Sequence, residues 1–188
     1  MQRFRILSLL LVACFATALL AQAPSSAPKP DPELKKLAVL VGHWTYEGEY
    51  KPGPLGPGAK IKGAYDAHMI LGGFFLQEEE VEKSDAGEMR NLAIESYNPA
   101  NKNFDSRWYQ SDGSTVNGTL TINGNTITWA GTLYVDGKPY QFREPMVCSA
   151  DFTTCPAKAE ISTDGKTWVP FFETTFIKAK PAAKKSGG

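Results

Sequence analysis

Histidine and cysteine are both scarce in this sequence, whose 188 residues include two histidines and three cysteines. A catalytic zinc site uses three protein ligands, and nothing in the spacing of His43 and His68 indicates a third. The serine-hydrolase signature G-x-S-x-G is absent. The glycine-rich run at 53–58 contains two prolines and precedes no helical pattern, which excludes a phosphate-binding loop. The sequence therefore indicates no catalytic residues, no metal and no other cofactor, and it favours a protein that is not an enzyme.

An excess of either charge is lacking as well. Lys and Arg together number 20, as do Asp and Glu, so the formal net charge is zero. Because long-range attraction to phosphates needs a net or clustered positive charge, this composition argues against nucleic acid as a partner. Long apolar runs are also few, and the one at residues 6–20 is the most pronounced.

This apolar run has the flanks of an export signal. Two arginines precede it, and a small-residue cleavage site follows, with cleavage after Ala21 or Ala23. At roughly 15 residues, the run is shorter than the ~20 of a membrane-spanning helix. We therefore predict a signal peptide at 1–23, a periplasmic or secreted protein, and no membrane span after cleavage. A retained N-terminal anchor is one alternative. A lipid anchor at Cys14 is another, although the apolar run continues past this cysteine.

A single domain is predicted to follow. Residues 24–33 are rich in Pro, Ser and Ala and are typical of a linker. Residues 34–178 have the length of one domain that can bury a core, and residues 179–188 read as a basic flexible tail. The exported chain retains Cys148 and Cys155, an even pair around a hairpin-sized gap. Export and pairing together predict a disulfide, with two free thiols as the alternative if the chain is not exported.

Within the domain, a short helical pattern is followed only by strand patterns. Asp31 and Pro32 suit the start of a helix at 33–41. The Asn123-Gly124 pair marks a tight hairpin, and short connections favour antiparallel neighbours. Because closure removes exposed sheet edges, we predict an all-β, antiparallel up-and-down β-barrel of about ten strands with a short N-terminal helix; a β-sandwich is the alternative. The strand segments are expected at 44–50, 61–69, 74–82, 92–97, 104–110, 115–122, 126–131, 132–135, 140–147, 158–162 and 167–177.

Five short motifs in a fixed order resemble one bacterial family. They are Leu40-Val41-Gly42-His43-Trp44, the Ile-Leu-Gly-Gly-Phe-Phe-Leu segment at 70–76, Ser96-Tyr97-Asn98-Pro99, a strand containing Trp108, and Phe142-Arg143-Glu144. Over most of 37–178 the chain is similar to the family called domain of unknown function 1579. This family resembles the calycins, which are the lipocalin and fatty-acid-binding barrels. The resemblance implies a calycin-like barrel and brings no established reaction with it.

Haem-binding barrels provide a second comparison. The spacing Gly42-x-Trp44-x-x-x-Gly48 is similar to the start of nitrobindin-like haem barrels. Those barrels have a glycine where this chain has Tyr46, and they ligate iron through a histidine near the C-terminal end. No histidine follows His68 in this sequence, so we predict no haem.

Aromatic residues indicate what the barrel does. A barrel of about ten strands can be wide enough to leave an apolar cavity, in which Arg107 or Arg143 could meet a carboxylate headgroup. Trp44 is expected to plug the closed end. The loop at 53–58 is either a plain Gly/Pro connection or, by analogy with lipocalins, a lid over the open end. In contrast, Glu78, Glu80 and Glu82 share one face of a strand and are expected to face water, because like charges at this density need solvent. The predicted ligand-binding residues are Trp44, Tyr46, Arg107, Trp108, Trp129, Phe142 and Arg143.

The function that follows is an exported, non-catalytic barrel that binds a small apolar or amphipathic ligand. Two alternatives remain open. One is an interaction or structural module of the cell envelope that uses the outer sheet face and the basic tail. The other is a small hydrolase or isomerase with its site inside the barrel, which would need a buried polar pair.

Overall fold

The computed structural model describes residues 27–180. The predicted signal peptide, the alternative lipid-anchor site at Cys14 and most of the basic tail lie outside the described residues. Within the described part, no helix has both the length and the apolar character needed to cross a membrane.

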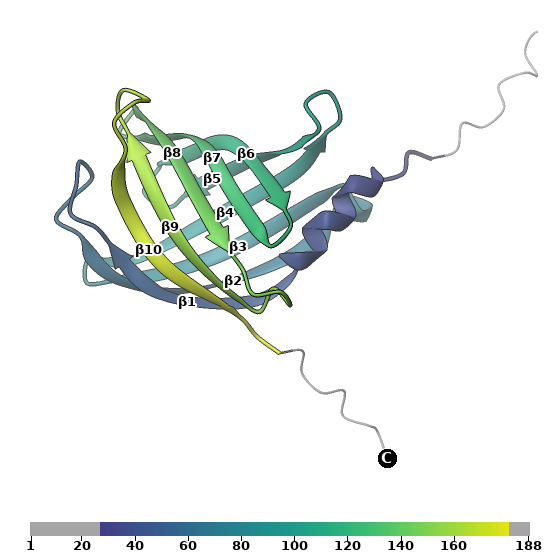
Figure 1. Ribbon diagram of the computed structural model, residues 1–188, viewed down its shortest axis with the longest axis horizontal. Helices are drawn as coiled ribbons and strands as arrows, with labels where there is room; N and C mark the ends of the chain where they lie inside the picture. The colour runs from purple at the N-terminus through teal and green to yellow at the C-terminus, as the bar shows by residue number, and fades with distance from the viewer. Residues whose placement is uncertain (1–26, 181–188) are drawn as a thin grey trace, which may run out of the picture.

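The domain is a closed antiparallel barrel of ten strands (Figure 1). Each strand pairs with its neighbours in sequence, and β10 pairs with β1 from Trp44↔Lys178 to Tyr50↔Phe172, which closes the sheet. The predicted up-and-down barrel is thus confirmed, and the alternative of a sandwich is wrong. The elements are η1 (Pro32–Val39), β1 (Gly42–Tyr50), β2 (Ala59–Ile70), η2 (Leu71–Gly73), β3 (Phe75–Ser84), β4 (Gly87–Asn98), β5 (Asn103–Gln110), β6 (Thr115–Asn123), β7 (Thr126–Val135), β8 (Lys138–Val147), β9 (Thr154–Ser162) and β10 (Val169–Lys178).

Two segments that were expected to be separate form one strand. The segments expected at 126–131 and 132–135 form the single strand β7. Gly131, the last residue of the first segment, lies directly opposite Gly118 on β6. A Cβ atom on Gly131 would lie 2.3 Å from the carbonyl oxygen of Asn117. The glycine therefore permits a close approach of two backbones rather than a turn.

The end of the barrel at which β1 begins is closed. The helix η1 is a 3₁₀-helix that ends at Val39, two residues earlier than expected, and the Asp31 side chain accepts a hydrogen bond from the Glu33 backbone N–H at 2.9 Å, as a cap does. Its residues Leu34 and Leu37 are buried in the barrel core, together with Leu40 just beyond it. Apolar burial therefore holds this short helix across the closed end.

The predicted disulfide is present at the same end. Cys148, just after β8, is bonded to Cys155 at the start of β9. Both cysteines are buried, with 3% and 0% of their surface exposed, and belong to the core cluster that includes the helix leucines. The bond therefore fixes the β8–β9 connection beside the helix.

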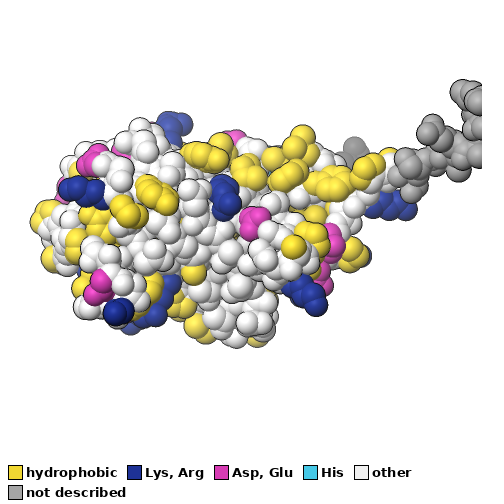
Figure 2. All heavy atoms as spheres, turned by 90° about the horizontal axis from the view of Figure 1, so that it is seen from above, with side chains coloured by type: hydrophobic (Ala, Val, Ile, Leu, Met, Phe, Trp, Pro, Cys, Tyr) yellow, Lys and Arg dark blue, Asp and Glu magenta, His cyan; other side chains and the backbone are white. Residues whose placement is uncertain are grey.

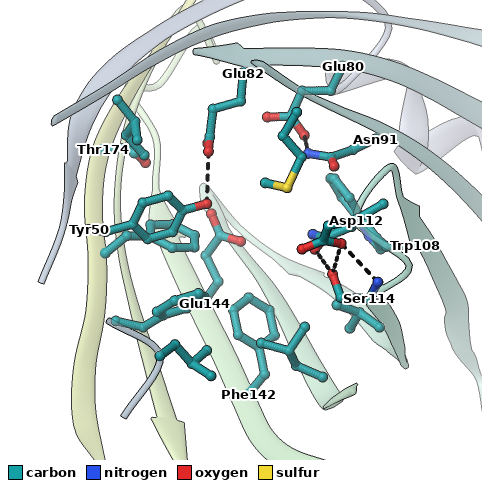
Figure 3. Close-up of a pocket in the computed structure, with 18 of the residues that line it drawn as sticks. Tyr50, Glu80, Glu82, Asn91, Trp108, Asp112, Ser114, Phe142, Glu144 and Thr174 are labelled. Carbon is teal, nitrogen blue, oxygen red and sulfur yellow. Dashed lines mark hydrogen bonds between the residues drawn. The ribbon is translucent and has the colours of Figure 1, made fainter. Parts of the chain in front are cut away.

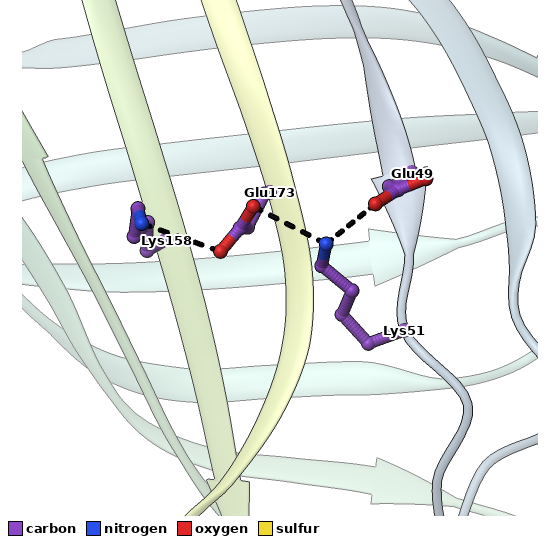
Figure 4. A network of polar contacts seen from close by, with 4 residues as sticks. All are labelled: Glu49, Lys51, Lys158 and Glu173. Atoms are coloured by element: carbon purple, nitrogen blue, oxygen red, sulfur yellow. Dashed lines mark hydrogen bonds and ion pairs between the residues drawn. The ribbon is translucent and has the colours of Figure 1, made fainter.

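The outer face near the β1–β10 closure carries a network of charges (Figure 4). Glu49 and Glu173 lie directly opposite each other on β1 and β10, where like charges would repel. Lys51 contacts both carboxylates, and Lys158 lies 3.4 Å from Glu173. The lysines hold the pKa of Glu173 below its usual range. Because these groups are exposed, each ion pair contributes little to the free energy of unfolding. The lysines mainly offset the repulsion between Glu49 and Glu173 across β1 and β10.

The rest of the outer surface mixes polar and apolar groups. Figure 2 shows hydrophobic side chains scattered among polar ones, with a band of them toward the end of the molecule where the N-terminal segment leaves. The most exposed large hydrophobic residue is Leu71, followed by Tyr109, Val147 and Ile177. These belong to η2, β5, β8 and β10, and single exposed apolar residues of this kind are ordinary in folded proteins.

Candidate functional site

The barrel encloses a cavity of about 680 Å³ that opens at the end opposite η1. Residues of every strand except β9 line it, and so do Leu55 to Gly58 of the β1–β2 loop. The predicted position of this loop, at the open end, is therefore confirmed. Much of the wall is aromatic: the ring centroids of Tyr46 and Phe176 are 4.9 Å apart, and those of Tyr50 and Phe171 are 5.2 Å apart. This part of the wall suits an apolar molecule.

Buried glutamates form the opposite part of the interior. Glu78, Glu80 and Glu82 of β3 point inward, and Figure 3 shows Glu80, Glu82 and Glu144 directed into one space with Tyr50. Only 2% of Glu78 and 7% of Glu82 is exposed. The prediction that this acidic run faces water is therefore wrong. The prediction that the three glutamates share one face of β3 is correct. Leu76, which is fully buried, lies on the same face, and that face points into the barrel.

Two tyrosines link the glutamates of β3. The hydroxyl of Tyr46 is within hydrogen-bonding distance of Glu80, and it lies 2.9 Å from Glu82 Oε2; Tyr50 donates to Glu82 Oε1 at 3.0 Å. A phenol carries one proton, which Tyr46 shares between the carboxyl groups of Glu80 and Glu82. The side-chain amide of Asn91 completes this group by donating to Glu80 Oε2 at 2.9 Å.

A glycine makes room for the first tyrosine. Gly63 lies directly opposite Tyr46 in the β1–β2 pair. A Cβ atom at position 63 would lie 2.4 Å from Tyr46 Cζ and 2.5 Å from its hydroxyl. Since a Cβ atom does not approach non-bonded atoms this closely, only glycine lets the ring lie against β2 with its hydroxyl between Glu80 and Glu82.

A second polar group lies deeper in the barrel. Ser106 Oγ donates to Glu95 Oε1 at 3.2 Å and accepts from the Trp108 indole at 3.0 Å. The indole of Trp129 lies near enough to Glu95 to influence it, but short of hydrogen-bond geometry. Five polar atoms in this interior lack partners within the described residues: Glu78 Oε1, Asn91 Oδ1, Glu95 Oε2, Trp129 Nε1 and Thr174 Oγ1.

Burial changes the ionisation of these carboxyl groups. Loss of hydration raises the pKa of Glu95 to about 8. Loss of hydration, followed by the nearby charge of Glu80, raises the pKa of Glu144 to about 8. Burial raises the pKa of Glu78 well above its usual range, with further contributions from Glu95, Glu80 and Glu144. For Glu80 and Glu82 burial again raises the pKa, while their tyrosine hydrogen bonds lower it.

No basic side chain compensates these carboxyl groups within residues 27–180. Lys51 alone among the lysines and arginines lines the cavity. Its ammonium group contacts Glu49 and Glu173 on the outer face (Figure 4). The interior is thus acidic without a counter-ion from the protein.

Four of the predicted ligand-binding residues, Tyr46, Trp108, Trp129 and Phe142, line the cavity. Trp44 lies below it at the closed end, as predicted for a plug residue. It is fully buried, its indole donates to the Leu40 carbonyl at 2.8 Å, and its ring stacks on Tyr65 at 5.8 Å.

The two arginines lie on the outer face. Arg107 donates to the Gly118 carbonyl at 3.3 Å. Arg143 pairs with Glu160 at 2.6 Å and stacks over Trp168. The prediction that one of them meets a carboxylate inside the barrel is therefore wrong. The reason is strand alternation, which turns Trp108 and Phe142 inward and their neighbours outward.

The histidines also lie outside. His43 contacts Asp66 at 2.9 Å in an exposed pair, and His68 is exposed on β2. Across residues 27–180, no three side chains of His, Cys, Asp or Glu are grouped in a way that could hold a metal ion.

Solved structures with this fold include two barrels of low sequence identity. A crystal structure of Rv2717c from M. tuberculosis matches with a TM-score of 0.59 and 13% identity, covering 81% of this chain and 100% of the other. The S-type phycobiliprotein lyase CPES from Guillardia theta matches with a TM-score of 0.52 and 11% identity, covering 78% and 92%. At such identities the similarity concerns the fold alone. No protein of curated function matches the sequence.

The sequence itself matches one family over nearly the whole barrel. The model of the family described as "Protein of unknown function (DUF1579)" covers residues 29–178. This span includes η1, all ten strands and the buried glutamates described above. The chain therefore belongs to the DUF1579 family.

Proposed function

We propose that this protein is exported and binds a small amphipathic molecule inside the barrel without changing it chemically. The observation that carries the proposal is a cavity of about 680 Å³ with an aromatic wall and unpartnered polar atoms. This volume is within the ~300–1,000 Å³ usual for small-molecule sites.

The unpartnered atoms support a ligand with a polar end. A buried acceptor without a hydrogen bond costs ~1–3 kcal/mol of stability, and Glu78, Asn91 and Glu95 each have one such oxygen. A ligand group that donates hydrogen bonds offsets this cost on binding, while an apolar body contacts the aromatic wall. An amphipathic molecule therefore fits the cavity better than a purely apolar one.

Export is supported by two independent features. The first 23 residues carry the pattern of a signal peptide. The domain contains a disulfide between Cys148 and Cys155, and such bonds persist mainly in oxidising compartments. Fractionation of cells that express the full chain tests this part. Mature protein in the periplasm or medium is the expected result, and full-length protein in the cytoplasm would contradict it.

Two measurements test ligand binding. Native mass spectrometry of gently extracted protein is expected to show a mass added to that of the mature chain. The neutral dye Nile red is expected to bind with a blue-shifted emission.

Val116 lines the cavity and the next residue of β6, Asn117, is exposed on the outer face. Val116→Trp should therefore abolish dye binding and Asn117→Trp should not. Equal dye binding by both variants, or no bound mass and no dye binding by the wild type, would refute the proposal.

A second candidate function, acid–base catalysis in the same cavity, is favoured by Glu144. Its pKa of about 8 is suited to proton transfer near neutral pH. The ligand extracted from the protein should then be altered on incubation with fresh wild-type protein and left intact by Glu144→Gln. Chromatography with mass detection distinguishes this outcome from simple binding, in which both proteins return the ligand unchanged.

A further inference from the structure

We infer that the ligand is an organic cation, and that its ammonium group is held inside the barrel by Glu78 together with Glu80 and Glu144. This inference rests on the proposed function and specifies its ligand. It concerns the inner part of the cavity around Tyr65, where side chains of β2, β3, β4 and β8 meet.

Buried carboxyl groups face this part of the cavity. Glu78 and Glu80 of β3 and Glu144 of β8 line it, and Figure 3 shows Glu80 and Glu144 directed into one space. The charges of Glu95, Glu80 and Glu144 contribute, after burial, to the raised pKa of Glu78. Glu78 is 2% exposed, lines the cavity and leaves Oε1 without a partner within the described residues. An unpartnered acceptor of this kind is a place for a donor group of the ligand.

The excess of acidic side chains in the cavity favours a ligand whose hydrogen-bond donor is positively charged. Like charges that share a buried site disfavour each other's ionisation. Among the lysines of residues 27–180, Lys51 alone lines the cavity, and its ammonium group is engaged on the outer face. A carboxylate ligand would add a further negative charge and is opposed. An ammonium group compensates the carboxylates and donates hydrogen bonds to them, which is the stronger class of hydrogen bond.

The walls favour an organic cation over a metal ion. Tyr65, Trp129 and Phe176 line the same cavity, and aromatic faces attract ammonium groups through cation–π interactions. The volume of about 680 Å³ is far larger than a single ion needs and leaves room for an apolar body. A primary amine with an alkyl or aromatic body satisfies both the carboxyl groups and the aromatic wall.

Binding of such a cation should be linked to proton release. Burial raises the pKa values of Glu78, Glu80, Glu95 and Glu144, those of Glu95 and Glu144 to about 8, so protonation of these groups competes with binding of a cation. An ammonium group favours their ionised form. The affinity for an amine should therefore increase as the pH rises from 5 to 8, while the amine itself stays protonated. The titratable groups that face Glu78 are these glutamates of β3, β4 and β8, and Tyr65 of β2.

Three probes of equal chain length test the inference. Decylamine, decanol and decanoate are each titrated against the purified protein loaded with Nile red at pH 8. The amine is expected to displace the dye at a concentration about tenfold lower than the alcohol, because one charge-assisted hydrogen bond contributes about this factor to affinity. Decanoate is expected to displace the dye least effectively. If the alcohol or the acid competes as well as the amine, the inference is overturned, whereas the dye signal itself still supports a binding cavity. If the dye does not bind at all, the proposed function fails first.

A matched pair of variants on one strand locates the ammonium group. Glu78 faces inward and Glu79, the next residue of β3, is exposed on the outer face. Glu78→Gln should lose the roughly tenfold preference for the amine over the alcohol, a ratio that does not depend on its own affinity for Nile red, as well as part of its pH dependence. Glu79→Gln should retain both. Retention of the preference in Glu78→Gln would overturn the assignment of Glu78.

Discussion

Replacement of Glu95 by glutamine should change how the stability of the barrel depends on pH. Glu95 is fully buried, and one of its oxygens accepts from Ser106 while the other lacks a partner within the described residues. Burial raises its pKa from the ordinary value of 4.5 to about 8. Glutamine has nearly the same shape and cannot ionise. The substitution therefore removes one titrating group while leaving the packing largely in place.

The sign and size of the effect follow from the two pKa values. Below pH 4.5 the carboxyl group is protonated in the folded and the unfolded chain, and its ionisation has no effect. As the pH rises from 4.5 to about 8, the unfolded chain releases this proton and the folded chain retains it. The free energy of unfolding then falls by about 1.4 kcal/mol per pH unit. The full loss is on the order of 5 kcal/mol by pH 8 and does not grow further.

Urea unfolding followed by tryptophan fluorescence, at several pH values between 5 and 8, measures this slope. The wild type should lose stability across the range, and Glu95→Gln should lose less, with a slope shallower by about 1 kcal/mol per pH unit. Any cost of the unpaired glutamine amide is a constant offset and leaves the slope unchanged. Glu79→Gln, on the outer face of β3, serves as the control and should follow the wild type. Parallel curves for Glu95→Gln and the wild type would refute the reasoning.

Three further substitutions test other parts of the structure. Gly63→Ala should displace the Tyr46 ring and lower the unfolding free energy by ~1–3 kcal/mol in urea titrations, whereas an unchanged midpoint would contradict the close contact at 2.4 Å. The double substitution Cys148→Ser and Cys155→Ser opens a short loop and should cost about 2 kcal/mol, seen as a lower melting temperature that reductant no longer affects. Leu37→Ala removes a fully buried side chain from the closed end and should cost ~2–5 kcal/mol in the same melting experiment; a loss below ~1 kcal/mol would mean that the helix is not part of the core.

Local signals in the sequence were sufficient for most of the fold. The hairpin predicted from Asn123-Gly124 joins β6 and β7, with Gly124 and Asn125 as its two turn residues, and the helix cap at Asp31 is present. Such features depend on neighbours in the chain, so they can be read without knowledge of the rest. The division of β7 failed because a glycine in a turn and a glycine opposite a second glycine are alike in sequence. Only the register with β6 distinguishes them.

The acidic half of the site could not be predicted in the same way. Alternation shows that Glu78, Glu80 and Glu82 share one face of β3. Whether that face points into the barrel or toward solvent depends on how the neighbouring strands pair with β3. The general rule that charged groups need water then led to the prediction that these glutamates face solvent, whereas they face the interior. One local signal was available, since Leu76 belongs to the same alternating set and is buried. Ser106 lies opposite Glu95 on the neighbouring strand β5, but this pairing depends on the register of β4 and β5, which the sequence alone did not give.

The chain enters and leaves the barrel at one end. Trp44 pairs with Lys178 across β1 and β10, and the ammonium group of Lys178 donates to the Val39 carbonyl at 2.8 Å beside the helix. The cavity opens at the opposite end. An affinity tag, a fluorescent protein or a solid support joined to the chain directly after Lys178 is therefore on the far side from the entrance. Immobilised protein should exchange small molecules as freely as protein in solution, which makes the barrel suitable for screening on a sensor surface.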